Sequence, residues 1–201
     1  MDTNVLNNIS YGLYVLTTKD GDKDNGCIIN TVQQVTSSPC VIAVTVNKEN
    51  YTHEMIMNTG EFNISFISID TEFDVFEKFG FCSGKEADKF ADWKDAERSK
   101  NGIYYLTKGV NAYLSAKLFH SVDLGTHTMF LAKVTDSESL SEDPSLTYAY
   151  YHRHVKPKPK ATENGGYRCI VCGYVYEGDE LPPDYVCPWC KHGPEDFERI
   201  E

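Results

Sequence analysis

The sequence lacks both a long apolar run and an excess of basic residues. No stretch approaches the roughly 20 consecutive apolar residues that a membrane-spanning helix requires. The formal net charge is −11, whereas a protein that binds nucleic acid presents a basic surface to the phosphates. The N-terminal segment MDTNVLNNISYGLYVLTT has no basic region followed by the apolar block of a secretory signal. We therefore expect a cytoplasmic protein whose partners include neither a membrane nor nucleic acid.

Several common cofactor and metal motifs are also missing. No G-x-G-x-x-G follows a predicted strand and no P-loop occurs, so nothing indicates a Rossmann or nucleoside triphosphate site. The six histidines form neither H-x-x-x-H nor H-E-x-x-H, which disfavours a histidine-based metal site. The seven cysteines are an odd number, and in a reducing cytosol paired cysteines favour metal ligands or redox centres over disulfides.

Four of the cysteines form two C-x-x-C pairs near the C-terminus, in YRCIVCGYVYEGDELPPDYVCPWC. Cys169 and Cys172 make the first pair, and Cys187 and Cys190 make the second. Two residues between thiolates let one tight loop aim both sulfurs at the same ion, and two such loops complete a tetrahedron. Gly173 follows the first pair, where such a loop often requires positive φ. The spacing predicts a metal site but leaves structural zinc and redox iron both open.

The residues that flank the two pairs resemble rubredoxin. The shared features are Cys-Gly-Tyr after the first pair, a Glu-Gly-Asp turn, Leu-Pro-Pro-Asp-aromatic, and Cys-Pro-x-Cys. The resemblance covers Tyr167–Glu201 and implies one iron held by the four cysteines. It also implies a small aromatic core made of Tyr167, Tyr174, Tyr176, Tyr185 and Phe197.

Two departures from rubredoxin and the charge of the module refine this expectation. The segment between the pairs is shorter than in free-standing rubredoxins, and Lys191 stands where the second loop usually has glycine. The module has three basic and eight acidic residues. An acidic surface suits docking to a redox partner and disfavours a zinc ribbon that reads nucleic acid.

A Lys/Pro-rich stretch, HRHVKPKPKATENGG, divides the chain. It predicts an extended, flexible linker over 152–166, between a domain at 1–151 and a small module at 167–201. A module of 35 residues cannot bury enough apolar surface to fold on hydrophobic collapse alone, so it needs a metal or another staple. The division therefore supports metal binding independently of the cysteine spacing.

The first domain reads as mainly β, with short peripheral helices. Asn25-Gly26 predicts a hairpin turn, and Cys27 and Cys40 stand in apolar strand context that predicts burial. Helical periodicity predicts one helix over Tyr51–Gly60 and another in DTEFDVFEKFGF, after the N-cap candidate Asp70. Strands are predicted over Tyr11–Lys19, Cys40–Asn47, Gly60–Ser68 and Gly109–Leu140, the last of which breaks at Asp123 to Gly125. These elements predict a β-barrel.

Three segments in order resemble the FMN-binding split-barrel flavin reductases. They are YGLYVLTTKDGDKDNGCIINTVQQVTSSPCVIAVTVNKENYTHEMI, FGFCSGKEADKFADW and GTHTMFLAKV, which together span Tyr11 to Val134. The resemblance implies a split β-barrel, bound FMN, a nicotinamide donor and a homodimer with flavin at the subunit interface. It leaves NADH and NADPH both open, because no 2′-phosphate pocket is identifiable.

The resemblance also implies which residues contact the cofactor. Backbone groups of an edge run would face the pyrimidine edge of the flavin; the run is Asn30, Thr31, Val32, Gln33 and Gln34. Hydroxyls, cations and a helix N-terminus would hold the phosphate; these residues are Asn47, Lys48, Tyr51, Thr52, His53, Ser83, Gly84, Lys85 and Lys89. His127 is the candidate catalytic residue, near the flavin ring or the nicotinamide pocket. Two alternatives stay open: Lys48 and Lys85 are solvated rather than bound to the phosphate, and His127 has a structural rather than a catalytic role.

The combination of the two domains resembles the high-molecular-weight rubredoxins of anaerobes. It implies that NAD(P)H reduces FMN, which then passes single electrons to the iron and on to a flavodiiron protein. One alternative is a flavin or ferric reductase whose rubredoxin tail is an accessory electron port. Others are an electron carrier loaded by ferredoxin or another reductase, and a zinc-ribbon interaction module on a β-barrel.

Overall fold

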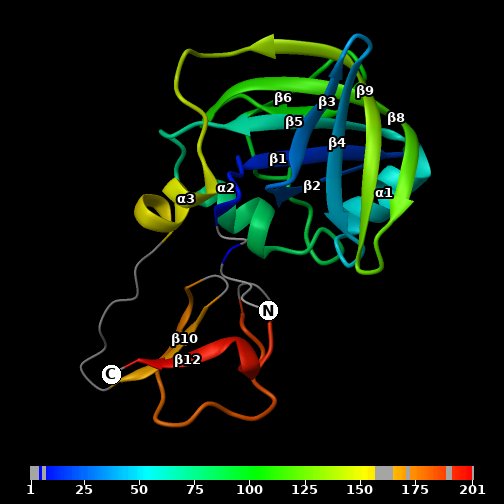
Figure 1. The fold of residues 1–201 in the computed structure, drawn as a ribbon. Helices are drawn as coiled ribbons and strands as arrows, with labels where there is room; N and C mark the ends of the chain where they lie inside the picture. Colours follow the sequence, from blue (N-terminus) through cyan, green and yellow to red (C-terminus); the bar gives the residue numbers. More distant parts are fainter. Residues whose placement is uncertain (1–4, 6–7, 157–164, 171–172, 189–191, 201) are drawn as a thin grey trace.

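The computed structural model describes residues 5, 8–156, 165–170, 173–188 and 192–200, which form a large and a small unit (Figure 1). The large unit is built on one antiparallel sheet of seven strands in the order β2-β1-β5-β8-β9-β4-β3. These strands are β1 Tyr14–Asp20, β2 Lys23–Ile29, β3 Val32–Ser37, β4 Cys40–Asn47, β5 Glu61–Ile67, β8 Val110–Asp123 and β9 His127–Ser139. A separate two-stranded ribbon pairs β6 Ala96–Arg98 with β7 Tyr104–Leu106.

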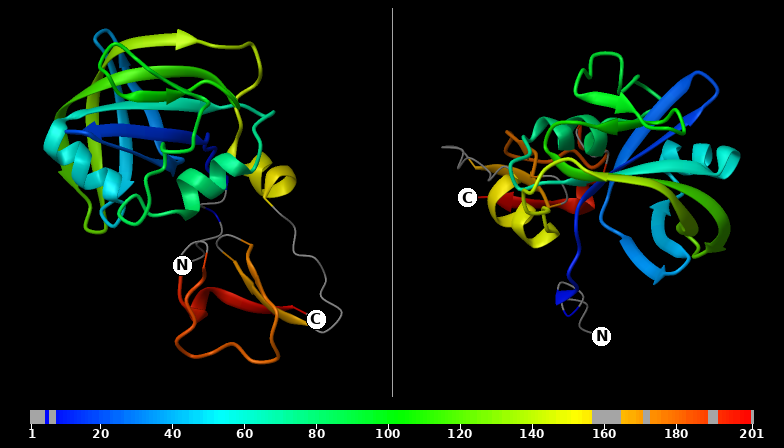
Figure 2. Two further views of the ribbon diagram at one scale, coloured as in Figure 1. Left: turned by 180° about the vertical axis from the view of Figure 1, so that it is seen from behind. Right: turned by 90° about the horizontal axis from the view of Figure 1, so that it is seen from above.

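The sheet curls until its two ends face each other. In Figures 1 and 2, β3 and β4 cross over β1 and β2 in both the front and the rear view. Strands β8 and β9 are the longest, with 14 and 13 residues, and register shifts after Ser115 and Leu118 bend this pair. The predicted β-barrel and the predicted break between β8 and β9 are confirmed.

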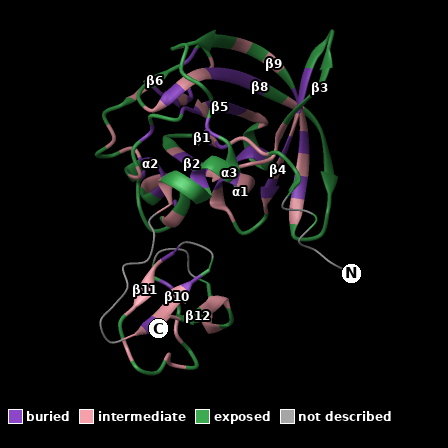
Figure 3. Ribbon diagram, turned by 60° about the vertical axis from the view of Figure 1, so that its left-hand side comes forward, coloured by how far each residue is buried: buried purple, intermediate pink, exposed green. Residues whose placement is uncertain are grey.

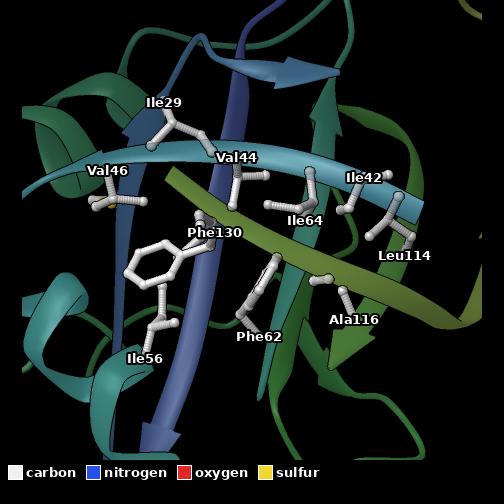
Figure 4. Packing of buried hydrophobic residues seen from close by; sticks show 13 residues of the cluster. Ile29, Ile42, Val44, Val46, Ile56, Phe62, Ile64, Leu114, Ala116 and Phe130 are labelled. Carbon is white, nitrogen blue, oxygen red and sulfur yellow. The ribbon is translucent and has the colours of Figure 1, made fainter. Parts of the chain in front are cut away.

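The interior of the curled sheet holds the main hydrophobic core. Leu16 on β1, Val44 on β4 and Phe62 on β5 converge there with Phe130 from β9 (Figure 4). Helix α1, Tyr51–Thr59, closes one end of the barrel with the fully buried side chain of Ile56. Because the barrel encloses this cluster, its strands are held in place by burial from opposite sides.

A second cluster covers the outer face of β1. Val15 is fully buried there although its neighbour Leu16 points into the barrel, as alternation along a strand requires. The covering elements are α2, Asp74–Phe76, which continues as a π-helical turn over Glu77–Phe81, and α3, Tyr148–Tyr150, which continues over Tyr151–Val155. Both faces of β1 are therefore buried.

The predicted turn at Asn25-Gly26 is wrong. Asn25 pairs with Thr18 and Gly26 pairs with Thr17 inside the β1–β2 ladder, and the chain reverses at Gly21, where φ is +59°. A glycine with positive φ is what a tight reversal demands. Asn25 is consequently a buried strand residue, 1% exposed, rather than a surface turn residue.

Other local predictions divide into confirmed and corrected ones. Helix α1 ends at Thr59 with Gly60 in the left-handed conformation, as predicted. The second helix begins at Asp74, not after Asp70, because the Asp70 carboxylate accepts a hydrogen bond from the Ser68 hydroxyl and caps nothing. Cys27 is buried as predicted, whereas Cys40 is exposed at the start of β4.

The large unit extends past its predicted boundary at residue 151. Residues 152–155 belong to the helical turn Tyr151–Val155, because Tyr151 and Val155 pack into the second core cluster. The predicted extended linker can therefore begin only after this turn, and its residues 157–164 lie outside the described part. None of the helices within the described ranges is long and apolar enough to cross a membrane.

The small unit is a three-stranded antiparallel sheet in the order β11-β10-β12. Its strands are β10 Gly166–Cys169, β11 Val175–Tyr176 and β12 Phe197–Ile200, and a short 3-10 turn over Pro194–Asp196 precedes β12. In Figures 1 and 2 this sheet lies below the end of the large unit that carries α2.

Candidate cofactor cavity and metal centre

A cavity of about 300 Å³ opens where β2, the N-terminus of α1 and the segment after α2 meet. Asn25 and Cys27 contribute from β2, Tyr51 and Thr52 from α1, and the loop 79–84 supplies the opposite wall. Five predicted phosphate residues line it, namely Tyr51, Thr52, Ser83, Gly84 and Lys89. Residues more than 50 positions apart in the chain thus meet at one site.

Lys89 is the buried charged residue of this cavity. Its side chain is 3% exposed, and its ammonium donates to the carbonyl of Gly26 at 2.7 Å and to that of Phe79 at 3.3 Å. Burial lowers the pKa of Lys89. Within the described part of the chain no carboxylate forms an ion pair with it. A buried ammonium without an acidic partner is costly, and an anionic ligand in the cavity would offset that cost.

Asn25 is the second polar group built into the cavity wall. Its Nδ2 donates to the Thr52 hydroxyl at 3.3 Å, and its Oδ1 is buried without a hydrogen-bond partner among the described residues. A Cβ on Gly84 would lie 2.2 Å from that Oδ1, so only glycine allows the loop to approach so closely. Because a side-chain amide can turn over and then donate into the cavity, Asn25 could hydrogen-bond to a ligand. The sequence alone did not indicate this role.

The N-terminus of α1 adds donors to the same site. Asn50 is its N-cap residue but makes no capping hydrogen bond through its side chain. The first amide N–H groups of the helix, at the positive end of its dipole, can therefore donate to a ligand. Lys23 and Lys85 hold their ammonium groups 4.4 and 5.9 Å from the centre of the Tyr51 ring. Glu49 and Glu86 also line the cavity, which leaves Lys89 and the helix end as its anion-attracting features.

The remaining predicted contacts lie elsewhere on the same sheet. The run 30–34 leads into and along β3, an edge strand that is exposed over most of its length (Figure 3). Asn47 ends β4 and pairs in register with His127 at the start of β9. Lys48 forms an ion pair with Asp123 at 2.7 Å, as expected for a solvated lysine.

His53 is oriented by its neighbours rather than by the cavity. Its Nε2 lies 2.8 Å from the hydroxyl of Thr128, and its ring packs 5.5 Å from that of Phe130. Burial, with a smaller contribution from Lys48, lowers the pKa of His53. The structure therefore splits the predicted cofactor residues into a cavity group and a group along β3, β4 and β9.

The small unit brings two of the four predicted metal ligands together. Cys169 and Cys187 are both fully buried in one cluster, while Cys172 and Cys190 lie outside the described residues, as does Lys191. Gly173 has φ +88° and donates to the carbonyl of Cys169 at 2.9 Å, which closes the first loop as the sequence predicts. Two buried thiols converging from two C-x-x-C loops fit a tetrahedral metal ion.

An aromatic cluster supports these loops, as predicted. The ring of Tyr185 lies 4.6 Å from that of Tyr176 and 5.4 Å from that of Phe197. The hydroxyl of Tyr185 donates to that of Tyr174 at 3.3 Å. Burial, followed by this hydrogen bond, raises the pKa of Tyr185. Tyr167 pairs with Tyr176 across β10 and β11, so all five predicted aromatic residues belong to this sheet or pack on it.

Comparison with known families gives two matches that divide the chain at the same place as the fold. Residues 6–159 match the flavin reductase like domain. Residues 167–198 match the rubrerythrin, rubredoxin-like domain. The first match includes the helical turn over Tyr151–Val155 and agrees with the later boundary of the large unit.

Individual relatives share one or both of these domains. A ferric-chelate reductase (NAD(P)H) of Archaeoglobus fulgidus is 38% identical, covering 81% of this chain and 95% of its own. An NADH:FAD oxidoreductase, SgcE6, of Streptomyces globisporus C-1027 has the same fold, with a TM-score of 0.65 and 21% identity over 71% of this chain and 83% of that chain.

One relative matches the chain from end to end. The high molecular weight rubredoxin of Moorella thermoacetica is 40% identical, and the alignment covers all of both chains. The predicted domain pairing is thereby confirmed. The chain belongs to the high-molecular-weight rubredoxins, in which a flavin-reductase-like domain precedes a rubredoxin-like domain.

Proposed function

We propose that this chain is an NAD(P)H-dependent oxidoreductase that passes electrons from FMN to an iron held by Cys169, Cys172, Cys187 and Cys190. The observation that carries the flavin half is the buried ammonium of Lys89 in a cavity beside a helix N-terminus. The convergence of Cys169 and Cys187 supports the iron half. The ferric-chelate reductase relative supports nicotinamide as donor.

The cavity residues would hold the FMN phosphate. Lys89 supplies a fixed positive charge, the first amides of α1 donate along the helix axis, and Ser83 supplies a hydroxyl. Asn25 can turn its amide and donate to the same anion. Glycine at 84 lets the opposite wall of the cavity approach the Asn25 amide closely. Each of these groups is positioned by packing before the ligand arrives, which lowers the entropic cost of binding.

The run 30–34, Asn47 and His127 would serve the flavin ring. An edge strand offers unpaired backbone groups, and these suit the donors and acceptors along the pyrimidine edge. We assign His127 to the ring or the nicotinamide because it pairs with Asn47 at the end of β4. When bound, FMN accepts two electrons from a nicotinamide and releases them singly, which matches an iron that carries one electron at a time.

The proposal predicts two chromophores and a defined order of reduction. The purified full chain is expected to show flavin absorption together with ferric–thiolate absorption, with one iron per chain by elemental analysis. Anaerobic addition of NADH or NADPH should reduce the flavin first and then bleach the iron. Zinc in place of iron would instead favour a ribbon that mediates protein interaction. A flavin that reduces while the iron stays ferric would contradict the internal relay.

The acceptor distinguishes the proposed carrier from a flavin or ferric reductase. The alignment with the ferric-chelate reductase covers 81% of this chain and 95% of that relative, so a ferric substrate is the specific alternative. We propose a flavodiiron protein as the acceptor, because the acidic small unit suits transient docking to a partner. Faster turnover with a ferric chelate or free flavin than with a flavodiiron protein would favour the alternative.

We further propose that the chain forms a homodimer through the β3 edge and the β8–β9 hairpin. Phe119, Val122 and Leu124 are exposed apolar residues at this end of the sheet, and Val35 is exposed on β3. Phe119→Asp should raise the dimer dissociation constant at least about tenfold, a change of about 1.4 kcal/mol, in sedimentation equilibrium. Met57→Asp, at an exposed position on α1, is the control. A monomeric wild type would refute the proposal.

A further inference from the structure

The side chain of Phe81 both lines the proposed cofactor cavity and touches the small unit. It ends the π-helical turn Glu77–Phe81 and contributes to the cavity wall next to Cys82. It also packs against the cluster of Cys169 and Cys187. A single aromatic ring therefore lies between the cavity and two of the proposed iron ligands.

The position of Phe81 is fixed by the large unit. Its ring packs 6.0 Å from that of Phe73, and both belong to the second core cluster with Phe76 and Phe79. An anchored ring presents a defined surface, because its rotamer freedom is already lost. The small unit consequently contacts a surface of the large unit that is already ordered before docking.

A second contact joins the two units on the same side. Lys156, just after the turn Tyr151–Val155, donates from its ammonium to the carbonyl of Ile170 at 3.2 Å. Ile170 lies in the first C-x-x-C loop, directly after Cys169, and its side chain is 52% exposed. The small unit has eight acidic and three basic residues, so the positive charge of Lys156 favours the loop on this side.

We propose that Phe81 is the docking contact that holds the iron loops of the same chain beside the cofactor cavity. This inference rests on the proposed function and adds the route: electrons pass within one chain, across Phe81, rather than through solution. Each NAD(P)H would supply two electrons and release one proton to solvent. The single iron of the chain would carry these electrons one at a time to the acceptor, which would return it to the ferric state after each transfer. Phe81 acts as a positioning residue and undergoes no chemistry itself.

The test compares Phe81→Ala, Phe81→Leu and Lys156→Gln in the full chain loaded with flavin and iron. Met57→Ala, at an exposed position outside both core clusters, is the matched control. Hydrogen–deuterium exchange of peptides over 77–84 and 165–170 reports docking without any electron transfer. Stopped-flow absorption separately reports reduction of the flavin by NADH and bleaching of the iron.

We expect Phe81→Ala to increase exchange in both peptides and to lower the docked population about tenfold, which corresponds to about 1.4 kcal/mol. Iron bleaching should slow relative to flavin reduction measured in the same sample, and Phe81→Leu should fall between Phe81→Ala and the wild type. Unchanged exchange in both Phe81 variants would overturn the docking proposal. If Phe81→Ala loses flavin, the exchange data of Phe81→Leu and Lys156→Gln decide. If NADH does not reduce the flavin of the wild-type protein, the proposed function is refuted. The exchange test of docking would still be valid in that case.

Discussion

Lys89→Met is expected to weaken FMN binding roughly 10- to 150-fold, because a hydrogen bond to a charged group contributes about 1.5–3 kcal/mol. The ammonium of Lys89 is held by the carbonyls of Gly26 and Phe79, and it has a third proton to donate to a phosphate oxygen. Methionine fills the same space without charge. The change in affinity is measured by titrating apoprotein with FMN and following the quenching of flavin fluorescence.

Two other lysines provide matched controls for this result. Lys48 pairs with Asp123 and Lys85 approaches the ring of Tyr51. Their methionine variants should change affinity by less than about fivefold, since exposed charge pairs contribute about 1 kcal/mol or less. Lys89→Arg keeps the charge and should retain part of the binding. Equal affinity in wild type and Lys89→Met would place the phosphate outside this cavity.

The pH dependence of apoprotein stability gives Lys89 an independent signature. Burial lowers its pKa in the folded state, so between that pKa and the ordinary value the unfolded chain binds more protons than the folded one. Stability then rises with pH across this window, and the penalty is complete below the folded pKa. Lys89→Met should remove this rise in urea unfolding measured at several pH values, and bound FMN should diminish it in the wild type.

The sequence was most informative where one residue type meets one local requirement. Two C-x-x-C pairs with flanking aromatics specify a metal loop without reference to the rest of the chain, and Gly173 adopts the predicted positive φ. Gly60 likewise ends α1 where the periodicity stops. Such features depend on neighbours a few positions away, which is why the small unit and α1 could be predicted.

Long-range packing decided the features that the sequence did not reveal. Asn25-Gly26 has the composition of a hairpin turn, yet the register of β1 with β2 buries it and the reversal moves to Gly21. Its role in the cavity depends on Gly84, nearly 60 residues later, which is close enough because the turn Glu77–Phe81 packs on β2. Phe81 similarly looks like one apolar residue of a helix until the small unit packs against it.

The same distinction explains the site as a whole. The segment that contains Lys89 matches a family pattern, but a pattern does not say which lysine among Lys23, Lys48, Lys85 and Lys89 is buried. Only Lys89 loses its water, and a charge has its strongest effect on a ligand where water is excluded. The anion site that we propose therefore depends on the tertiary fold, while the residue types that line it were recognisable in the sequence.

Cys187→Ser is expected to lower the affinity for iron by several orders of magnitude and to unfold the small unit. Cys187 is fully buried beside Cys169, and its amide donates to the carbonyl of His192 at 2.9 Å, which closes the second loop. Metal binding free energies of about 10–16 kcal/mol are shared among the ligands of such sites and act as folding free energy for small modules. A serine hydroxyl replaces a thiolate poorly as a ligand for iron.

Four measurements separate loss of metal from general damage. Elemental analysis and ferric–thiolate absorption should show loss of iron, and hydrogen exchange should show loss of protection in β10 and β12. Reduction of the flavin by NADH should continue, because the large unit has its own two core clusters. Cys40→Ser, at an exposed cysteine at the start of β4, should change none of these. Retained iron together with retained protection would exclude Cys187 as a ligand, whereas loss of flavin reduction would mean that the small unit is needed to fold the reductase unit.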